Sequence, residues 1–163
     1  SDPRRAEHAL EELAELFRAL MREPRDLVPL AEELTLCRRY LDIESLRLGD
    51  RLAVDWHVGE DAERAQVPPL MLQPLIENAI YHGVEQLAEP SRIGVAVVRQ
   101  GAELRIEVDN ALADGAQRVG NRIALDNIRE RLQLFFDMEA SLEAGARAGR
   151  FHVIVRMPYR EES

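Results

Sequence analysis

Two adjacent polar residues, Glu77 and Asn78, interrupt an apolar segment with helical spacing, and His82 follows Asn78 by four residues. This spacing places Asn78 and His82 on one face of a helix, one turn apart. Amide and carboxylate oxygens are hard ligands, and Mg²⁺ typically binds one or two of them together with waters and substrate phosphates. The segment is therefore suited to a magnesium site beside phosphates. The alternative is a solvent-exposed helix face with a hydrogen-bonded histidine near its end.

Two further stretches could take part in the same chemistry. Asp109 and Asn110 end an alternating apolar run, where a carboxylate can accept a hydrogen bond from an exocyclic amine such as that of adenine. A simple Asx turn is the alternative there. Gly120 leads into a helix start, whose free N–H groups attract anions, and Arg129 and Arg131 follow. Taken alone, each of these signals is weak.

The elements that must position these residues follow from the spacing of the apolar side chains. Helical spacing predicts one helix from Arg4 to Met21 and another from near Pro29 to near Gly49. Further helices are expected to close at Gly83 and to cover residues 123–136. Alternating patterns predict strands at residues 52–58, 93–97, 104–108, 141–143 and 151–157.

Strands joined as hairpins favour an antiparallel or mixed sheet, and the interspersed helices would all cover one face of it. The expected fold is therefore of the α+β class, a two-layer α/β sandwich. A doubly wound dinucleotide fold has no support, because no GxGxxG motif follows the first predicted strand.

Composition excludes several classes of protein. All 21 basic residues are arginine, so no lysine is available for a Walker A loop, a protein-kinase ATP site or a Schiff base. Cys37 stands alone, which excludes a disulfide and a zinc site built from several cysteines. The net charge of −9 argues against a general nucleic-acid binder. No apolar run approaches the ~20 residues of a membrane span, so we expect a soluble chain.

The order and spacing of these motifs resemble the C-terminal part of sensor histidine kinases of the LytS/AlgZ type, within the GHKL ATPase group. Three segments look like the linker signature of that family: residues 29–34, 40–44 and 47–52. Residues 67–83 are similar to its N box, and Asp109-Asn110 to the start of its first glycine box. Residues 125–132 fall at its second glycine box and the helix that follows.

This resemblance implies a Bergerat-type ATPase fold over residues 49–163, preceded by a helical connector over residues 1–48 that is the remnant of a dimerisation helix. It implies ATP and Mg²⁺ as cofactors, with Asn78 as the metal ligand. Glu77 would orient or activate the attacking histidine, and His82 would lie near the phosphates. Asp109 would hold the adenine amine. The other implied cofactor-binding residues are Asn110, Gly120, Ile123, Leu125, Asn127, Arg129 and Arg131.

The implied activity is transfer of the γ-phosphate of ATP to a histidine, and from there to a response regulator. No phosphoacceptor motif occurs in the sequence, so this histidine is expected on a dimerisation helix absent from the chain. The parent protein is expected to be a homodimer at the cytoplasmic side of the bacterial inner membrane. Neither nucleic acid nor direct membrane contact is expected for this segment.

Several positions depart from the family pattern. Tyr81 stands where lysine is usual, and Ala111 follows Asn110 where glycine is usual. Arg122 and Ala124 replace two glycines of the second box, although glycine allows positive φ and close backbone approach to phosphate. These departures leave an alternative open: a degenerate kinase domain with weak or no ATP binding that acts as a protein-interaction module.

Overall fold

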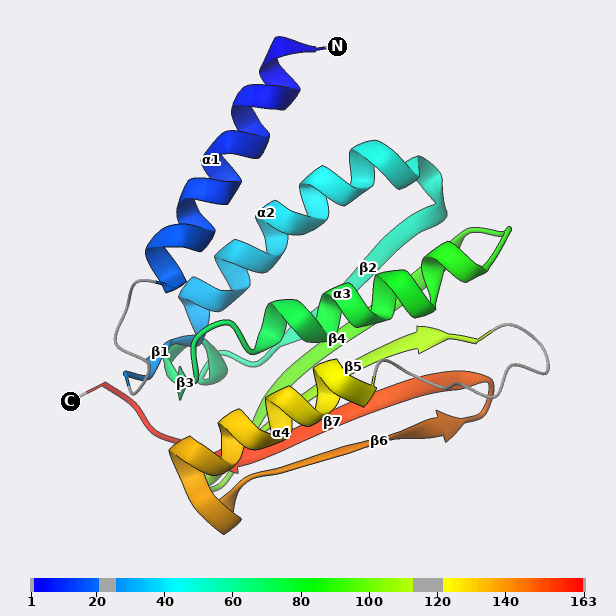
Figure 1. Ribbon diagram of the computed structural model, residues 1–163. Coiled ribbons are helices and arrows are strands. Elements are labelled where there is room, and N and C mark those ends of the chain that lie inside the picture. Colours follow the sequence, from blue (N-terminus) through cyan, green and yellow to red (C-terminus); the bar gives the residue numbers. More distant parts are fainter. Residues whose placement is uncertain (1, 21–25, 113–121, 163) are drawn as a thin grey trace.

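A computed structural model describes residues 2–20, 26–112 and 122–162 of the chain, without the side chains of residues 18–20 and 122. Figure 1 shows two layers, a sheet and a set of helices that covers one of its faces. The longer helices are α1 (Pro3–Leu20), α2 (Leu30–Leu48), α3 (Leu72–His82) and α4 (Arg122–Phe136). The main strands are β2 (Leu52–Val58), β4 (Ser91–Gln100), β5 (Glu103–Ala111), β6 (Ser141–Arg147) and β7 (Arg150–Pro158). The short strands β1 (Val28–Pro29) and β3 (Gln66–Val67) pair separately.

The main sheet is mixed. Its strands lie in the order β2-β4-β5-β7-β6, and β2 runs parallel to β4 while the other neighbours are antiparallel. The parallel pair arises because α3 lies in the connection between β2 and β4, whereas tight turns at Gly101 and Gly149 close the two hairpins with positive φ. The predicted mixed sheet of the α+β class, with helices on one face, is therefore confirmed.

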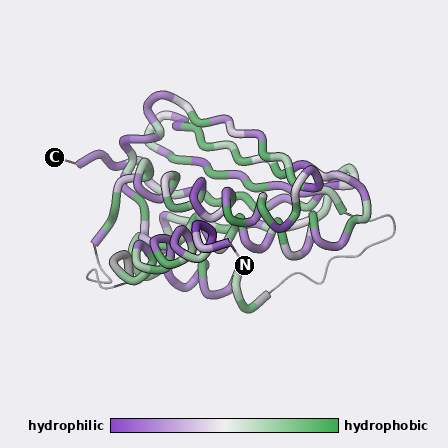
Figure 2. The backbone as a smooth tube through the Cα atoms, turned by 90° about the horizontal axis from the view of Figure 1, so that it is seen from above, coloured by the Kyte–Doolittle hydropathy of each residue, from purple (hydrophilic) through white to green (hydrophobic). Residues whose placement is uncertain are grey.

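The two faces of the sheet differ in chemistry. Along β5 every second side chain, at Leu104, Ile106 and Val108, is buried under the helices. Figure 2 shows the same alternation of hydropathy along the strands. The outer face carries polar side chains in ion pairs, such as Glu107 with the Nδ1 atom of His152 at 2.7 Å. Burial alone would raise the pKa of Glu107, but hydrogen bonds with His152 and a nearby arginine hold it below its ordinary value.

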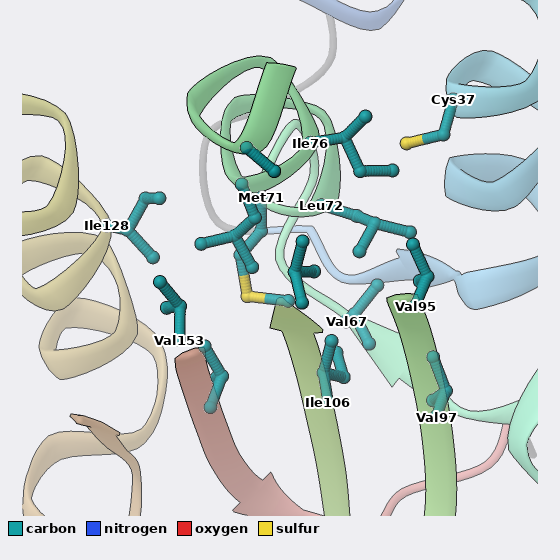
Figure 3. Packing of buried hydrophobic residues seen from close by; sticks show 14 of the residues in the cluster. Cys37, Val67, Met71, Leu72, Ile76, Val95, Val97, Ile106, Ile128 and Val153 are labelled. Carbon is teal, nitrogen blue, oxygen red and sulfur yellow. The ribbon is translucent and has the colours of Figure 1, made fainter. Parts of the chain in front are cut away.

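One hydrophobic core joins the helices to the inner face of the sheet. In Figure 3, Met71 and Leu72 point from the start of α3 to the strands that carry Ile106 and Val95. Cys37 of α2 lies in the same core, together with Leu34 and Leu41. Full burial of each such aliphatic side chain stabilises the fold by roughly 1.5–3 kcal/mol. Helix α2 is thus packed into the same core as the sheet, and the division of the chain after residue 48 stays a prediction.

Helix α1 stands outside this core. It packs on α2, where the Arg39 guanidinium lies 3.0 Å from the carboxylate of Glu15. Its apolar side chains Leu10, Leu13 and Phe17 remain exposed, so the described residues leave this stripe uncovered. The predicted first helix is confirmed up to Leu20, and Met21 lies outside the described residues. None of the described helices is both long and apolar enough to cross a membrane.

Candidate nucleotide site

Helix α3 ends at Gly83, where the surrounding atoms leave no room for a side chain. The sequence alone indicated this glycine only as a helix stop. The Gly83 N–H donates to the carbonyl oxygen of Ala79 at 3.0 Å, and its φ of −106° is open to any residue. A Cβ atom at Gly83 would lie 2.5 Å from the Ala79 oxygen and 2.6 Å from Nδ2 of Asn110. The glycine therefore lets the end of α3 approach the end of β5.

A cavity of about 310 Å³ lies along α3 and gathers the polar residues of its C-terminal half. Asn78 is buried, with 6% of its surface exposed, His82 is half-buried, and Glu77 is exposed at the rim. Among the described residues, the cavity is lined by Tyr40, Pro74, Glu77, Asn78, Ile80, Tyr81, His82, Glu85 and Ala124. The structure thus brings together three of the sequence-predicted residues and adds Ala124 from the first turn of α4.

The Glu77 carboxylate has one hydrogen-bond partner on its own helix and lines the cavity together with Tyr40. Gln73, one turn earlier on α3, donates its Nε2–H to Oε1 of Glu77 at 3.1 Å. Burial raises the pKa of the Tyr40 hydroxyl, and the carboxylates of Glu44 and Glu77 raise it further. Tyr40 therefore stays protonated beside Glu77. Sequence reasoning missed Tyr40, whose position on α2 relative to α3 depends on the fold.

The residues at the end of β5 face opposite sides of the sheet. Asn110 is 1% exposed on the helix side, where its Nδ2 donates to the carbonyl oxygen of Ala111 at 3.0 Å and packs against Gly83. Asp109 lies over Gly94 on the outer face, where its Oδ2 accepts from Nε of Arg150 at 2.5 Å. Successive side chains of a strand point to opposite faces, so the structure does not bring Asp109 to the cavity.

The predicted residues of the second glycine box that the structure describes differ in their exposure and do not line the cavity together. Leu125 is buried in the core, Asn127 is exposed, and Ile123 is 74% exposed. Gly120 lies outside the described residues. Ala124, which sequence reasoning noted only as a replacement for glycine, is the α4 residue that lines the cavity. The helical pattern of α4 predicts that Leu125 and Ile128 are buried, but it does not predict that Ala124 lines a cavity.

The two arginines of α4 also point away from the cavity. Arg129 donates to Oδ1 of Asp126 at 2.8 Å and to the carbonyl oxygen of Leu142 at 3.3 Å, toward β6. Arg131 donates to the carbonyl oxygen of Leu70 at 3.1 Å and to that of Pro69. Burial lowers the pKa of the Arg131 guanidinium, while Glu33 opposes this shift. Both guanidinium groups thus contact other parts of the fold, neither lines the cavity, and their phosphate contacts stay predictions.

The cavity can accept a divalent cation only together with other ligands. In the described part of the chain, no group of three or more His, Cys, Asp or Glu side chains could hold a metal ion. One buried amide oxygen beside a carboxylate fits Mg²⁺, which keeps several waters and binds substrate phosphates. The buried amide of Asn78 therefore fits a Mg²⁺–phosphate complex better than a metal held by protein alone.

Comparison with known proteins relates the chain to sensor histidine kinases. A family model described as histidine kinase matches residues 1–52. Sensor histidine kinase BtsS of Escherichia coli K12 is 29% identical over 99% of the chain, and sensor histidine kinase YesM of Bacillus subtilis is 29% identical over 94%. The chain is a homologue of the sensor histidine kinases. It spans 29% of the length of BtsS and 28% of that of YesM.

Solved structures show the same fold for this histidine kinase homologue. The catalytic domain of histidine kinase ThkA matches 83% of the chain and 97% of that domain, with a TM-score of 0.63 at 12% identity. ThkA crystallised with the response regulator protein TrrA matches 95% of the chain and 48% of that chain, with a TM-score of 0.59 at 12% identity. ShkA in complex with AMPPNP matches 98% of the chain and 37% of ShkA, with a TM-score of 0.59 at 16% identity. The fold is thus that of histidine kinase catalytic domains.

The contacts of the two arginines predict different mutant effects in this histidine kinase homologue. Arg131→Gln should lower the unfolding temperature by roughly 5–10 °C, because hydrogen bonds from a charged group contribute about 1.5–3 kcal/mol. Arg129→Gln should lower it by at most about 2–4 °C, since its exposed ion pair is worth at most ~1 kcal/mol. Thermal unfolding followed by circular dichroism measures both. Equal losses would contradict the burial and contacts of Arg131.

Proposed function

We propose that the chain is the ATP-binding catalytic domain of a two-component sensor histidine kinase. It transfers the γ-phosphate of ATP to a histidine on a helix absent from the chain, and the phosphate then passes to a response regulator. The observation that carries this proposal is the buried amide of Asn78 in a cavity shared with Glu77 and His82, on the helix that matches the N box. Homology to sensor histidine kinases supports the reaction class.

The chemistry divides among the residues of α3. Asn78 would hold Mg²⁺ through its amide oxygen, and the bound ion would neutralise phosphate charge during in-line transfer. A ring nitrogen of the incoming histidine donates its electron pair to the γ-phosphorus, and the bond to the bridging oxygen of ADP breaks. Glu77, oriented by Gln73, accepts a hydrogen bond from the N–H of the other ring nitrogen. Its carboxylate thereby stabilises the positive charge that develops on the ring. His82 lies one turn from Asn78, where an imidazole can donate to phosphate oxygen.

Asn110 takes the base-recognition role that the resemblance had given to Asp109. Its side chain faces the helix layer at the end of β5, next to Gly83, while that of Asp109 pairs with Arg150 on the outer face. The Asn110 amide donates to Ala111 through Nδ2, and its Oδ1 is the acceptor that we assign to an exocyclic amine. We therefore assign the adenine contact to Asn110.

This assignment predicts opposite outcomes for two adjacent residues. Asn110→Ala should raise the Kd of an ATP analogue up to about tenfold, because a lost hydrogen bond costs about 0.5–1.5 kcal/mol. Asn110→Asp keeps an acceptor and should retain the affinity. Asp109→Asn should change Kd less than about twofold, since its side chain lies on the other face. Calorimetric titration measures these Kd values. A larger increase of Kd for Asp109→Asn than for Asn110→Ala would return the adenine contact to Asp109.

The partners follow from the same proposal. The exposed stripe of Leu10, Leu13 and Phe17 on α1 suits helix packing in a homodimer of the whole protein. Residues 1–48 act as the connector to the dimerisation and phosphoacceptor helix, and residues 49–163 form the catalytic domain. The parent protein works at the cytoplasmic side of the bacterial inner membrane and passes phosphate to a response regulator.

The direct test is calorimetric titration of the chain with a non-hydrolysable ATP analogue, with and without Mg²⁺. We expect the chain to bind the analogue with a micromolar Kd when Mg²⁺ is present and more weakly without it. No binding at millimolar nucleotide would overturn it and favour a degenerate domain that works by protein contacts, consistent with Ala124 in place of a glycine at the cavity. A second assay supplies a phosphoacceptor helix in trans and follows transfer of labelled γ-phosphate from ATP.

A further inference from the structure

The first turn of α3 is capped by a carboxylate from another helix. Glu33 of α2 is 3% exposed, and its Oε1 accepts the N–H of Met71 at 2.9 Å and that of Leu72 at 3.4 Å. Met71, at the N-cap position of α3, provides no side-chain cap of its own. Burial raises the pKa of Glu33, and the backbone hydrogen bonds oppose that shift. Two N–H groups at the start of α3, those of Met71 and Leu72, are thus satisfied by α2.

Helix α4 holds the same turn from the other side. Arg131 donates to the carbonyl oxygens of Pro69 and Leu70. Leu70 has a φ of 55°, a left-handed conformation that costs a non-glycine residue about 1–3 kcal/mol. Such a conformation persists only where the surroundings fix it. Glu33 on α2 and Arg131 on α4 therefore both form hydrogen bonds with the backbone of one short segment, residues 69–72.

The position of this segment determines where Asn78 stands. Asn78 follows Leu72 by six residues on one uninterrupted helix, roughly 9 Å further along the axis at about 1.5 Å per residue. A helix of this length moves as a rigid unit, so a shift of its first turn moves Asn78 by a similar amount. The cavity is also lined by Ala124, which belongs to α4 together with Arg131.

We propose that Glu33 and Arg131 are positioning residues that fix the start of α3 between α2 and α4, and thereby place Asn78 for metal and phosphate binding. The inference rests on the proposed function of Asn78. It also gives α2 a direct mechanical connection to the site, because a displacement of α2 acts on α3 through the carboxylate of Glu33.

The experiment compares Glu33→Ala and Glu33→Gln with Cys37→Ala. Cys37 lies one turn later on α2 and is fully buried in the apolar core, whereas the carboxylate of Glu33 accepts the N–H of Met71. The readout is the ratio of Kd without Mg²⁺ to Kd with Mg²⁺ for an ATP analogue, measured well below the unfolding temperature of each variant. A purely structural role would lower the unfolding temperature and leave this ratio unchanged in the folded protein.

We expect Glu33→Ala to lower the ratio at least fivefold. Glu33→Gln restores a neutral acceptor and should recover part of the loss. Cys37→Ala should keep the wild-type ratio although its unfolding temperature falls. An unchanged ratio in both Glu33 variants would overturn the proposal, as would an equal loss in Cys37→Ala.

A second readout separates this inference from the proposed function. If the wild-type chain binds no nucleotide, the proposed function fails, and the NMR signals of the Asn78 side-chain amide still report its placement. Displacement of these signals in both Glu33 variants, with none in Cys37→Ala, would support positioning by Glu33. Unmoved signals in the Glu33 variants would refute it.

Discussion

Asn78→Ala is expected to abolish the magnesium-dependent part of nucleotide binding. With Mg²⁺ present, the Kd of an ATP analogue should rise by about 30–100-fold, since even outer-shell partners of metal ligands are worth roughly 10–100-fold in metal affinity. The physical reason is that Asn78 supplies the buried oxygen of the cavity, which water cannot easily replace in a position that is 6% exposed. Without Mg²⁺, wild type and variant should bind the analogue equally weakly.

The neighbouring residue supplies the matched control. Glu77→Gln changes one exposed side chain on the same turn and keeps its size, so it should leave Mg²⁺-dependent binding intact. It should instead lower the rate of phosphate transfer to a phosphoacceptor supplied in trans by about 10²–10⁴-fold, the usual contribution of a positioned acid or base. Retention of magnesium dependence in Asn78→Ala would show that Asn78 is not the metal ligand.

The site on α3 could be predicted because its signal is local. The segment from residue 72 to residue 82 carries its own helical pattern, and the spacing of Asn78 and His82 places both on one face without knowledge of the rest of the fold. Strands β4 and β5 were equally predictable from sequence, since buried residues alternate with less buried ones along most of their length. Local periodicity therefore determined the elements and the polar face of α3.

The opposite orientations of Asp109 and Asn110 follow from a signal that was present in the sequence. Leu104, Ile106 and Val108 alternate with outward residues, and the same period of two carries Asn110, not Asp109, to the helix side. Residue type favoured the carboxylate, while the position within the strand favoured the amide. At a strand end the alternation is the stronger constraint, because a shift by one residue turns every side chain to the other face.

The contacts of Arg131 illustrate what local patterns cannot supply. A guanidinium group favours a phosphate contact by its chemistry alone. In the structure it instead reaches carbonyl groups 61 and 62 residues earlier in the chain, next to a carboxylate from a third helix. Such a contact depends on how α2, α3 and α4 pack, and sequence spacing carries no information about that packing.

Gly83→Ala is expected to be the most destabilising small substitution near the site. The new Cβ would meet the Ala79 carbonyl oxygen at 2.5 Å and the Asn110 side chain at 2.6–2.7 Å. Neither group can move freely, because one belongs to the helix backbone and the other is buried. Overpacking of this kind costs about 1–3 kcal/mol, so the unfolding temperature should fall by roughly 4–10 °C.

Two other glycines serve as graded controls for that substitution. At Gly59 the nearest atom to an added Cβ is the Val97 carbonyl oxygen at 3.6 Å, an ordinary contact, so Gly59→Ala should be nearly neutral. At Gly94 the added Cβ would meet the Asp109 carboxylate at 2.1 Å, but that side chain is half-buried on the outer face and can rotate. Gly94→Ala should therefore fall between the other two. An unfolding temperature for Gly83→Ala no lower than that of Gly59→Ala would contradict the close approach of α3 and β5.

The same contact ties stability to nucleotide binding. Because Gly83 lets Asn110 lie against the end of α3, an alanine there must displace Asn110 or the last turn that carries His82. Gly83→Ala should therefore raise the Kd of the ATP analogue as well as lower the unfolding temperature, whereas Gly94→Ala should affect stability alone. The substitution on the helix side of β5 would then change both affinity and stability, and the one on the outer face would change stability only. A loss of affinity in Gly94→Ala equal to that in Gly83→Ala would mean that the outer face, with Asp109, takes part in binding.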